Sequence, residues 1–340
     1  MSQKELSVAV IGCGFGCTHI NELAQGHPRL KLAAVCDADE TRLTGQRNNP
    51  ALKGQNILFT QDYHQILNDP KIDIVSLALP HHLHERFAVE TANAGKHIML
   101  DKPIARTLEE ADQIIAAAEK NQIKLMVAFN YRYSALYSTI QKTLIGGAIG
   151  KVLLAVTRHY QRFYYPGGSN WRNSASVGGG CIMGSGVHNL DMLRFCMGEP
   201  DEVFAYAVND AKRLDAEAAA TVVYKYANGA IVNFLCNWVK SSSNSTKDPA
   251  QVFGQWEFYG ENGELRPIDG QLLINRLDED PLPVEIPPEP GAFHTLWEHF
   301  ADCIQFNQTP LTNGLDAKAS LQLVLKTYES IKTGKPVKIK

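Results

Sequence analysis

The chain has 340 residues, a length that predicts two domains or one large one. Hydrophobic residues make up 44% of it and charged residues 20%, as in an ordinary soluble globular protein. The formal net charge is −3, and the lysines and arginines are scattered without a long basic run. These figures exclude a nucleic acid or an anionic membrane as a partner held by overall charge.

The cysteine pattern indicates a reducing compartment. Seven cysteines, with no C-x-x-C pair, favour free thiols in a cytoplasm over a secreted disulfide framework. The first apolar run breaks at Gly12, too early for a signal peptide, and no stretch reaches about 18 apolar residues. We expect a cytoplasmic protein. We expect no metal site at Cys13, Cys17 and His19, nor at HHLH (81–84).

Short apolar strands alternate with helices over residues 1–125. The expected strands are LSVAVI (6–11), KLAAVCD (31–37), DIVSLALP (73–80), HIML (97–100) and KLMVAF (124–129). Helices are expected at 18–26, at 84–95 with Gly95 as its cap, and after Thr107, which has the capping-box spacing to Glu110. The alternation predicts parallel βαβ units and a doubly wound Rossmann domain.

The pattern changes in residues 126–340, which we expect to form a second domain. Its strands are longer, and Asn228-Gly229 predicts a hairpin turn. Helices are expected at 188–197, 293–307 and 315–333, and surface loops at 240–250 and 281–290. The expected fold class is α/β, a Rossmann sheet followed by an α/β domain with an open, mostly antiparallel sheet.

The loop GCGFGCTH (12–19) resembles a dinucleotide fingerprint that lacks one residue. Gly12 and Gly14 fit G-x-G-x-x-G, but the third position falls on Cys17. Either Cys17 replaces the third glycine, or one residue is deleted and Gly16 takes its role. In both cases we expect the loop, with Phe15, to hold a pyrophosphate at a helix N-terminus.

Asp37 ends the second expected strand, where a carboxylate accepts hydrogen bonds from the adenosine ribose. A 2′-phosphate about 4 Å away would cost ~4 kcal/mol at an effective dielectric constant of about 20. Salt screens this repulsion and the nearby Arg42 softens it, but we expect NAD rather than NADP.

Two side chains are candidates for acid–base chemistry. Lys102 follows the strand HIML, at the sheet edge that faces ligands, and is either a catalytic ammonium group or a surface lysine. His188 begins an expected helix after a glycine-rich segment, with Asp191 on the same face. A helix N-terminus disfavours the charged imidazole, which suits a neutral base, although a core or capping histidine remains the alternative.

The chain resembles the glucose-fructose oxidoreductase/inositol dehydrogenase family (Gfo/Idh/MocA) nearly end to end. The matching segments are GKHIMLDKP, the helix and strand ending in NYRY, NWRNSASVGGG, GVHNLDMLRFCMGEP and TGKPVKI. The resemblance implies a Rossmann domain, a C-terminal α/β domain and a homo-oligomer, a dimer or tetramer, formed through the C-terminal sheet. It also implies NAD(P)-dependent oxidation or reduction of a sugar, polyol or related alcohol.

The resemblance further implies roles for individual residues. Lys102 matches the active-site lysine, and His188 matches the histidine that abstracts or returns the hydroxyl proton. Residues implied to lie near the cofactor or the substrate are Pro80, His81, Asp101, Asn130, Arg132, Trp171 and Arg172. Gly184 departs from the family, because many members have an aspartate there. An acid–base group is typically worth ~10²–10⁴ in rate, so Asp191 or a substrate group would have to take over.

Together these features predict an NAD-dependent oxidoreductase acting on a secondary alcohol of a sugar or polyol. Tyr160 and Arg162 are candidates for the substrate pocket, with sheet packing as the alternative. Two other functions stay open. One is an enzyme that holds NAD tightly and oxidises its substrate transiently to allow elimination or hydrolysis. The other is a non-catalytic dinucleotide-binding regulator.

Overall fold

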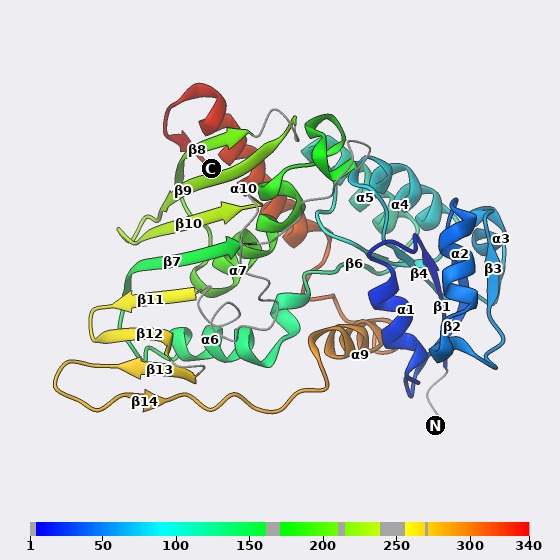
Figure 1. The fold of residues 1–340 in the computed structure, drawn as a ribbon, viewed down its shortest axis with the longest axis horizontal. Helices are drawn as coiled ribbons and strands as arrows, with labels where there is room; N and C mark the ends of the chain where they lie inside the picture. Colours follow the sequence, from blue (N-terminus) through cyan, green and yellow to red (C-terminus); the bar gives the residue numbers. More distant parts are fainter. Residues whose placement is uncertain (1–4, 161–170, 210–214, 239–255, 269–270, 340) are drawn as a thin grey trace. The chain divides into compact units, whose positions relative to one another are not determined.

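The computed structural model describes residues 5–160, 171–209, 215–238, 256–268 and 271–339. It divides into two compact units (Figure 1). Unit 1 comprises Met1–Tyr133 and Pro290–Leu321, and unit 2 comprises Ser134–Glu289 and Gln322–Lys340. The sequence analysis expects two consecutive domains, residues 1–125 and 126–340. The two units of the structure differ from these chiefly because the segment 290–321 returns to unit 1.

Unit 1 contains a six-stranded parallel sheet in the order β3-β2-β1-β4-β5-β6. The strands are β1 (Leu6–Ile11), β2 (Leu30–Cys36), β3 (Leu58–Thr60), β4 (Ile74–Leu77), β5 (His97–Leu100) and β6 (Leu125–Val127). This is the Rossmann order, with its switch point between β1 and β4, so the predicted doubly wound fold is confirmed. The short strand β3 was not expected from the sequence.

Helices and short turns connect these strands or follow the last of them along the chain. They are α1 (Cys17–Ala24), α2 (Glu40–Arg47), η1 (Pro50–Leu52), α3 (Tyr63–Leu67), η2 (His81–Leu83), α4 (His84–Asn93), α5 (Leu108–Lys120), η3 (Asn130–Tyr133) and α9 (Ala292–Gln305). Thr107 caps α5 by accepting the N–H of Glu110 at 3.2 Å, as its spacing predicted. Glu110 does not complete the capping box, because its carboxylate accepts the N–H of Arg106 instead.

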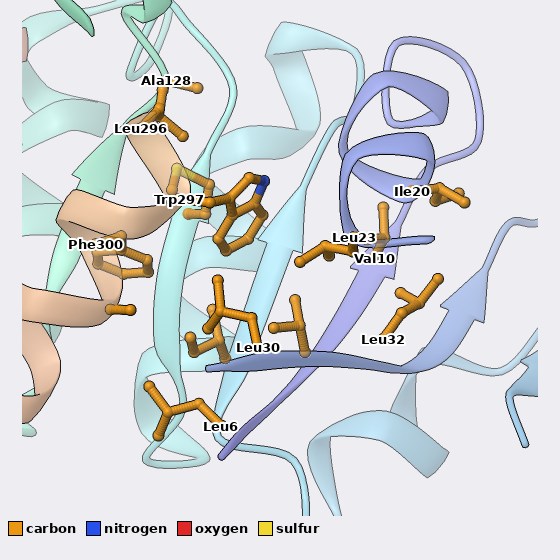
Figure 2. Packing of buried hydrophobic residues seen from close by; sticks show 14 of the residues in the cluster. Leu6, Val10, Ile20, Leu23, Leu30, Leu32, Ala128, Leu296, Trp297 and Phe300 are labelled. Atoms are coloured by element: carbon orange, nitrogen blue, oxygen red, sulfur yellow. The ribbon is translucent and has the colours of Figure 1, made fainter. Parts of the chain in front are cut away.

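The core of unit 1 explains why residues 290–321 belong to it. Leu296, Trp297 and Phe300 of α9 are fully buried in the same cluster as Leu6 of β1 and Leu30 of β2 (Figure 2). Burying a large apolar side chain contributes about 1.5–3 kcal/mol. Three such side chains therefore hold a distant segment of the chain on the Rossmann sheet.

Unit 2 contains a nine-stranded sheet in the order β14-β13-β12-β11-β7-β10-β9-β8-β15. The strands are β7 (Val152–Tyr160), β8 (Glu202–Asn209), β9 (Glu217–Lys225), β10 (Ile231–Asn237), β11 (Trp256–Gly260), β12 (Gly263–Ile268), β13 (Gln271–Asn275), β14 (Leu282–Pro283) and β15 (Val337–Lys338). Among the described strands of this sheet only β7 and β10 pair in parallel, so the mostly antiparallel sheet is confirmed.

The hairpin turn that the sequence predicts in unit 2 is confirmed. Asn228 and Gly229 form the β9–β10 hairpin, with Gly229 at φ +90°. The helical and turn elements are α6 (Ala135–Ile145), η4 (Trp171–Asn173), η5 (Ala175–Val177), the π-helix η6 (Ile182–Gly186), α7 (Val187–Met197) and α10 (Gly314–Thr333), which crosses the unit boundary. The expected loop 240–250 lies outside the described residues. In the described part of the chain, no helix combines the length and apolarity that spanning a bilayer requires.

Candidate functional site

The glycine loop joins β1 to α1 at the carboxyl edge of the parallel sheet. Gly12 adopts φ +98°, and a Cβ atom there would lie 2.3 Å from the carbonyl oxygen of Ala78. A Cβ atom on Gly14 would meet nothing nearer than Nη1 of Arg42, at 3.7 Å. The protein itself therefore requires glycine at position 12 but not at position 14. A glycine without an internal reason fits a place where a ligand must approach the backbone closely.

The loop contains one residue fewer than the usual fingerprint. A Cβ atom on Gly16 would lie 1.9 Å from the carbonyl oxygen of Gly12 and 3.1 Å from Cγ1 of Val10. The Cys17 side chain instead turns back, and its thiol donates to the carbonyl of Cys13 at 2.8 Å. The close helix–strand contact thus falls on Gly16. Of the two interpretations, the geometry favours the deletion over a cysteine in the third glycine position.

Asp37 is buried directly after β2 and braces the glycine loop. Its Oδ2 atom accepts the N–H of Cys13 at 2.6 Å, and Oδ1 accepts the N–H of Asp39 at 2.9 Å. Nη1 of the exposed Arg42 lies 3.7 Å from Oδ2. Each carboxylate oxygen keeps a further lone pair, so Asp37 can support the loop and still accept a hydrogen bond from a ligand.

Lys102 lies at the same sheet edge as the glycine loop. Its ammonium nitrogen is 6.0 Å from the ring centroid of Phe15, which belongs to that loop. Asp101 continues the β4–β5 pairing by donating its N–H to Leu77, and its carboxylate accepts the N–H of Lys102 at 2.9 Å. The backbone that carries the lysine is therefore anchored to β4 through Asp101.

His84 connects two loops of this edge, a role that the HHLH run did not reveal. Its Nδ1 atom lies 2.9 Å from the carbonyl oxygen of Pro103, and Nε2 lies 3.0 Å from that of Leu79. Burial lowers the pKa of His84, against the opposing charge of Asp101. The neutral ring donates to one carbonyl at a time and links the lysine loop to the end of β4.

The remaining unit 1 candidates follow β4 and β6. Pro80 precedes the turn η2, and the buried His81 ring lies 5.5 Å from that of His84. Asn130 and Arg132 share the turn η3. Because strands of a parallel sheet end at one edge, the loops after five strands bring these residues together with the glycine loop, Asp37 and Lys102.

Arg132 is buried and committed to an ion pair. Its Nη2 atom lies 2.9 Å from Oδ2 of Asp316, and the arginine side chain is only 5% exposed. Separating such a pair leaves a buried charge without compensation, which is strongly unfavourable. The pair fixes η3, the turn that also carries Asn130.

In unit 2 the segment Trp171–Arg172 rests on the glycine run 178–180. The Arg172 guanidinium lies 4.5 Å from the Trp171 ring centroid, within cation–π range. The carbonyl of Arg172 accepts the N–H of Gly180 at 3.1 Å, and a Cβ atom on Gly179 would lie 2.3 Å from it. These glycines are needed so that the tryptophan–arginine turn can pack closely.

Glu217 lies buried at the start of the helical segment that carries His188, and no sequence pattern indicated it. Its Oε1 atom accepts the N–H of Ile182 at 2.8 Å and the O–H of Tyr328 at 2.9 Å. Burial raises the pKa of the Glu217 carboxyl. The Oε2 atom would lie only 2.3 Å from a Cβ atom on Gly180, so glycine is required there too.

His188 is buried on α7, but it does not begin the helical segment as expected. The π-helix η6 (Ile182–Gly186) runs directly into α7, so helical structure begins about a turn and a half earlier. The dipole argument for a neutral His188 is therefore wrong, because helix-end effects fade within the first turn. Asp191 is fully buried on the same helix.

The residue after His188 anchors α7 to the sheet. Asn189 donates from Nδ2 to the hydroxyl of Thr157 at 2.6 Å, and its Oδ1 atom lies 2.9 Å from Nδ1 of His159. Thr157 and His159 are two residues apart on β7, so both lie on the face that packs against α7. Tyr160 follows on the opposite, open face and is 53% exposed. The structure therefore does not bring Tyr160 together with His188, and Arg162 lies outside the described residues.

Gly184 stands where many members of the resembled family have an aspartate, and Trp238 fills the space beside it. A Cβ atom on Gly184 would lie 2.7 Å from Cη2 of the Trp238 indole. The indole is held by a hydrogen bond from its Nε1 atom to the hydroxyl of Ser185, at 2.7 Å. Unit 2 thus offers an aromatic wall, rather than a carboxylate, four residues before His188.

Comparison with known proteins identifies the family. Residues 6–129 match the model of the oxidoreductase family with an NAD-binding Rossmann fold, and residues 137–266 match the Gfo/Idh/MocA C-terminal domain. The chain belongs to the Gfo/Idh/MocA oxidoreductases. It carries their NAD-binding Rossmann domain, and the glycine cradle described above fits that cofactor.

Individual relatives are similar over nearly the whole chain. The D-apiose dehydrogenase of Paraburkholderia graminis is 26% identical over 99% of this chain and 90% of its own length. The scyllo-inositol 2-dehydrogenase (NAD(+)) of Bacillus subtilis is 23% identical, covering 99% and 97%. The crystal structure of the aldose-aldose oxidoreductase from Caulobacter crescentus, complexed with glycerol, superposes with a TM-score of 0.84 at 25% identity, covering 98% and 100%.

Proposed function

We propose that this Gfo/Idh/MocA protein moves a hydride between NAD and a secondary alcohol of a sugar, polyol or related compound. The observation that carries the proposal is the Lys102 ammonium group, 6.0 Å from the Phe15 ring of the glycine loop. That position supplies a hydrogen-bond donor and a positive charge at the cofactor-binding edge of the sheet. The sugar and polyol dehydrogenases among its relatives support the substrate class.

Each residue then has a stated task. The N–H groups of the glycine loop bind the pyrophosphate, and Asp37 accepts a ribose hydroxyl. Lys102 donates to the substrate hydroxyl and stabilises negative charge on its oxygen, while His188 accepts and returns the hydroxyl proton. Bound NAD supplies the hydride acceptor. We assign Pro80, His81, Asp101, Asn130, Trp171 and Arg172 to the walls of the cofactor cleft, and Arg132 and Asp191 to the shape of the substrate site.

We expect NAD to be preferred over NADP. The buried Asp37 carboxylate would repel a 2′-phosphate by ~4 kcal/mol at about 4 Å and an effective dielectric constant of about 20. Arg42 moderates this repulsion, but its guanidinium already lies 3.7 Å from Asp37 and 3.6 Å from Asp39.

The test is a screen of NAD and NADP reduction against sugars, inositols and sugar phosphates. We expect turnover with NAD, and Lys102→Met and His188→Asn should each lower kcat by ~10²–10⁴ while NAD still binds. Product formed with bound NAD but without net NADH would support transient oxidation instead. An NAD-dependent protein partner together with no turnover would support the regulator.

We also propose that the open face of the unit 2 sheet pairs with a second copy of the chain. Tyr160, Tyr206 and Val208 lie 53–65% exposed on this face, and large exposed apolar patches mark interfaces. We expect Tyr206→Asp with Val208→Asp to yield monomers in light scattering. Leu277→Asp, at an exposed position between β13 and β14, is the matched control. A wild-type monomer would overturn this proposal. The free state of all seven cysteines supports a cytoplasmic location.

A further inference from the structure

We infer that His27, His294 and Glu298 form a binding site for a divalent transition-metal ion, with Zn²⁺ as the test ion. His27 lies between α1 and β2, whereas His294 and Glu298 lie four residues apart on α9 and so share one helix face. One ligand atom from each of the three lies within 4.8 Å of the others. All three belong to unit 1, and the inference does not depend on the proposed reaction.

The distances suit a small cation. Nε2 of His27 lies 2.9 Å from Oε1 of Glu298, and the two imidazole rings are 5.2 Å apart. Zn²⁺ binds nitrogen and carboxylate oxygen at about 2.0–2.2 Å, so two ligand atoms on one ion are separated by roughly 3–4 Å. Small side-chain rotations therefore bring these three atoms onto one ion, with a fourth position left for water.

Neighbouring residues orient the ligands. His294 Nδ1 lies 2.9 Å from Oε1 of Glu22, which holds the proton on Nδ1 and leaves Nε2 with its lone pair. Arg29 binds Oε2 of Glu298 and leaves Oε1 facing the histidines. Carboxylate partners behind ligating histidines, and hydrogen bonds to ligating carboxylates, are the usual supports of protein metal sites.

The same contacts set the cost of binding. Without a metal, the His27 Nδ1 atom accepts the backbone N–H of Arg29 at 3.2 Å, and Nε2 faces Glu298. An ion on Nε2 moves the proton to Nδ1, so this long hydrogen bond opens. Burial lowers the pKa of His27, which favours the neutral ring that a metal requires. His294 and Glu298 are 29% and 31% exposed, which gives the ion a route of entry.

A metal here would join α9 to the α1–β2 loop. The helix α1, which precedes this loop, packs against α9, because Trp297 of α9 lies edge-on to His19 of α1 at 5.5 Å. A ligand that binds only the folded state stabilises it by RT ln(1 + [L]/Kd), so the unfolding temperature rises with the logarithm of the free ligand concentration once this exceeds Kd. The sequence analysis did not indicate this site, since His27 lies more than 260 residues before the other two ligands.

The test uses the full chain stripped of metal and titrated with ZnCl₂ at neutral pH, followed by calorimetry and thermal unfolding. We expect one ion per chain and a higher unfolding temperature. His294→Gln and Glu298→Gln should each weaken Zn²⁺ binding by at least about ten-fold. Two controls should leave it unchanged: His64→Gln removes an exposed histidine, and Cys17→Ser removes the most exposed thiol.

Binding that the His294 and Glu298 variants do not weaken, or no binding at all, would overturn the inference. If a variant does not fold, Co²⁺ added to the wild-type chain decides instead. Ligand-field bands typical of nitrogen and oxygen donors support the site. Strong thiolate charge-transfer absorption would place the ion on a cysteine and reject it.

Discussion

The two glycine-rich segments of this chain, residues 12–16 in unit 1 and residues 178–186 in unit 2, need glycine for different reasons. In the first segment the missing Cβ atoms make room for backbone, since those of Gly12 and Gly16 would strike carbonyl oxygens of Ala78 and Gly12. In the second segment Gly179 likewise makes room for backbone, but the other constrained glycines make room for side chains from distant parts of the chain. Those side chains are Glu217 beside Gly180, Trp238 beside Gly184 and Phe234 beside Gly186. A backbone constraint recurs in any chain with this turn, whereas a side-chain constraint holds only with the partner residue.

The largest effect is expected for Gly16→Val in the first segment. A Cβ atom 1.9 Å from a carbonyl oxygen cannot be relieved by a rotamer change, so we expect the loss of more than about 3 kcal/mol of unfolding free energy. Denaturant unfolding and NAD binding measure it. Cys17→Gly, which restores a glycine at the usual third position, should change neither quantity much. A stable, NAD-binding Gly16→Val variant would contradict the backbone constraint.

Gly184→Asp tests the side-chain constraint. The new carboxylate would overlap the Trp238 indole, and we expect a loss of about 1–3 kcal/mol. Because the conflict is with one side chain, it should shrink in a Trp238→Ala background. A double-mutant cycle of denaturant unfolding should give a coupling of about 1–3 kcal/mol. Additive effects would show that Gly184 is constrained by something other than Trp238.

The same difference, between local constraints and those set by distant residues, explains which features could be predicted from the sequence. The strands 6–11 and 97–100 were predicted with the bounds that the structure has, because an apolar run between turn residues is a local signal. The same signal placed Lys102 at a strand end, at the ligand-facing edge of a parallel sheet. The return of residues 290–321 to unit 1 was missed, because it rests on contacts of Trp297 with residues far away in the chain.

Around His188, local sequence patterns identified the motif but not the residues that hold it in place. The motif G-V-H identified His188, yet the π-helix before it and the buried Glu217 carboxylate that binds its first N–H group were not predicted. Neither has a sequence signature of its own. Glu217 is 35 residues from Ile182, and only the folded sheet brings the two together. The filling of the Gly184 position by Trp238 is likewise a tertiary effect.

Glu217→Gln tests the support of the second glycine segment through the pH dependence of stability. Burial raises the pKa of Glu217 above 4.5, so the folded state takes up this proton more readily than the unfolded state. The stability that the glutamate contributes is complete below pH 4.5 and is lost as the pH rises through its raised pKa. The stability difference between wild type and Glu217→Gln should therefore shift in favour of the wild type as the pH falls. A difference that does not depend on pH would rule out a buried, titrating carboxyl.

Gly14→Ala should separate ligand contact from internal packing. Its nearest neighbour would be Arg42 at 3.7 Å, an ordinary contact, so the unfolding free energy should change by less than about 0.5 kcal/mol. If the open face of Gly14 receives the pyrophosphate, the added methyl group weakens NAD binding and raises the KM for NAD. Equal NAD affinity in both proteins would place the cofactor elsewhere.

The smallest expected effect is an increase in the unfolding free energy, at a glycine that neither the backbone nor a neighbouring side chain requires. Gly45 lies exposed inside α2, its φ is not positive, and a Cβ atom there would meet nothing within 4 Å. Alanine reduces the freedom of the unfolded chain without strain, so Gly45→Ala should raise the unfolding free energy by about 0.5–1 kcal/mol. Gly26 is the matched control, because its Cβ atom would also find open space but its φ is +87°. Gly26→Ala should destabilise by about 1 kcal/mol, since alanine there pays for a left-handed backbone. If both substitutions stabilise the protein, backbone conformation does not govern these positions. The argument that Gly12 needs glycine for its positive φ would then fail, and only the close approach of the Ala78 carbonyl would support it.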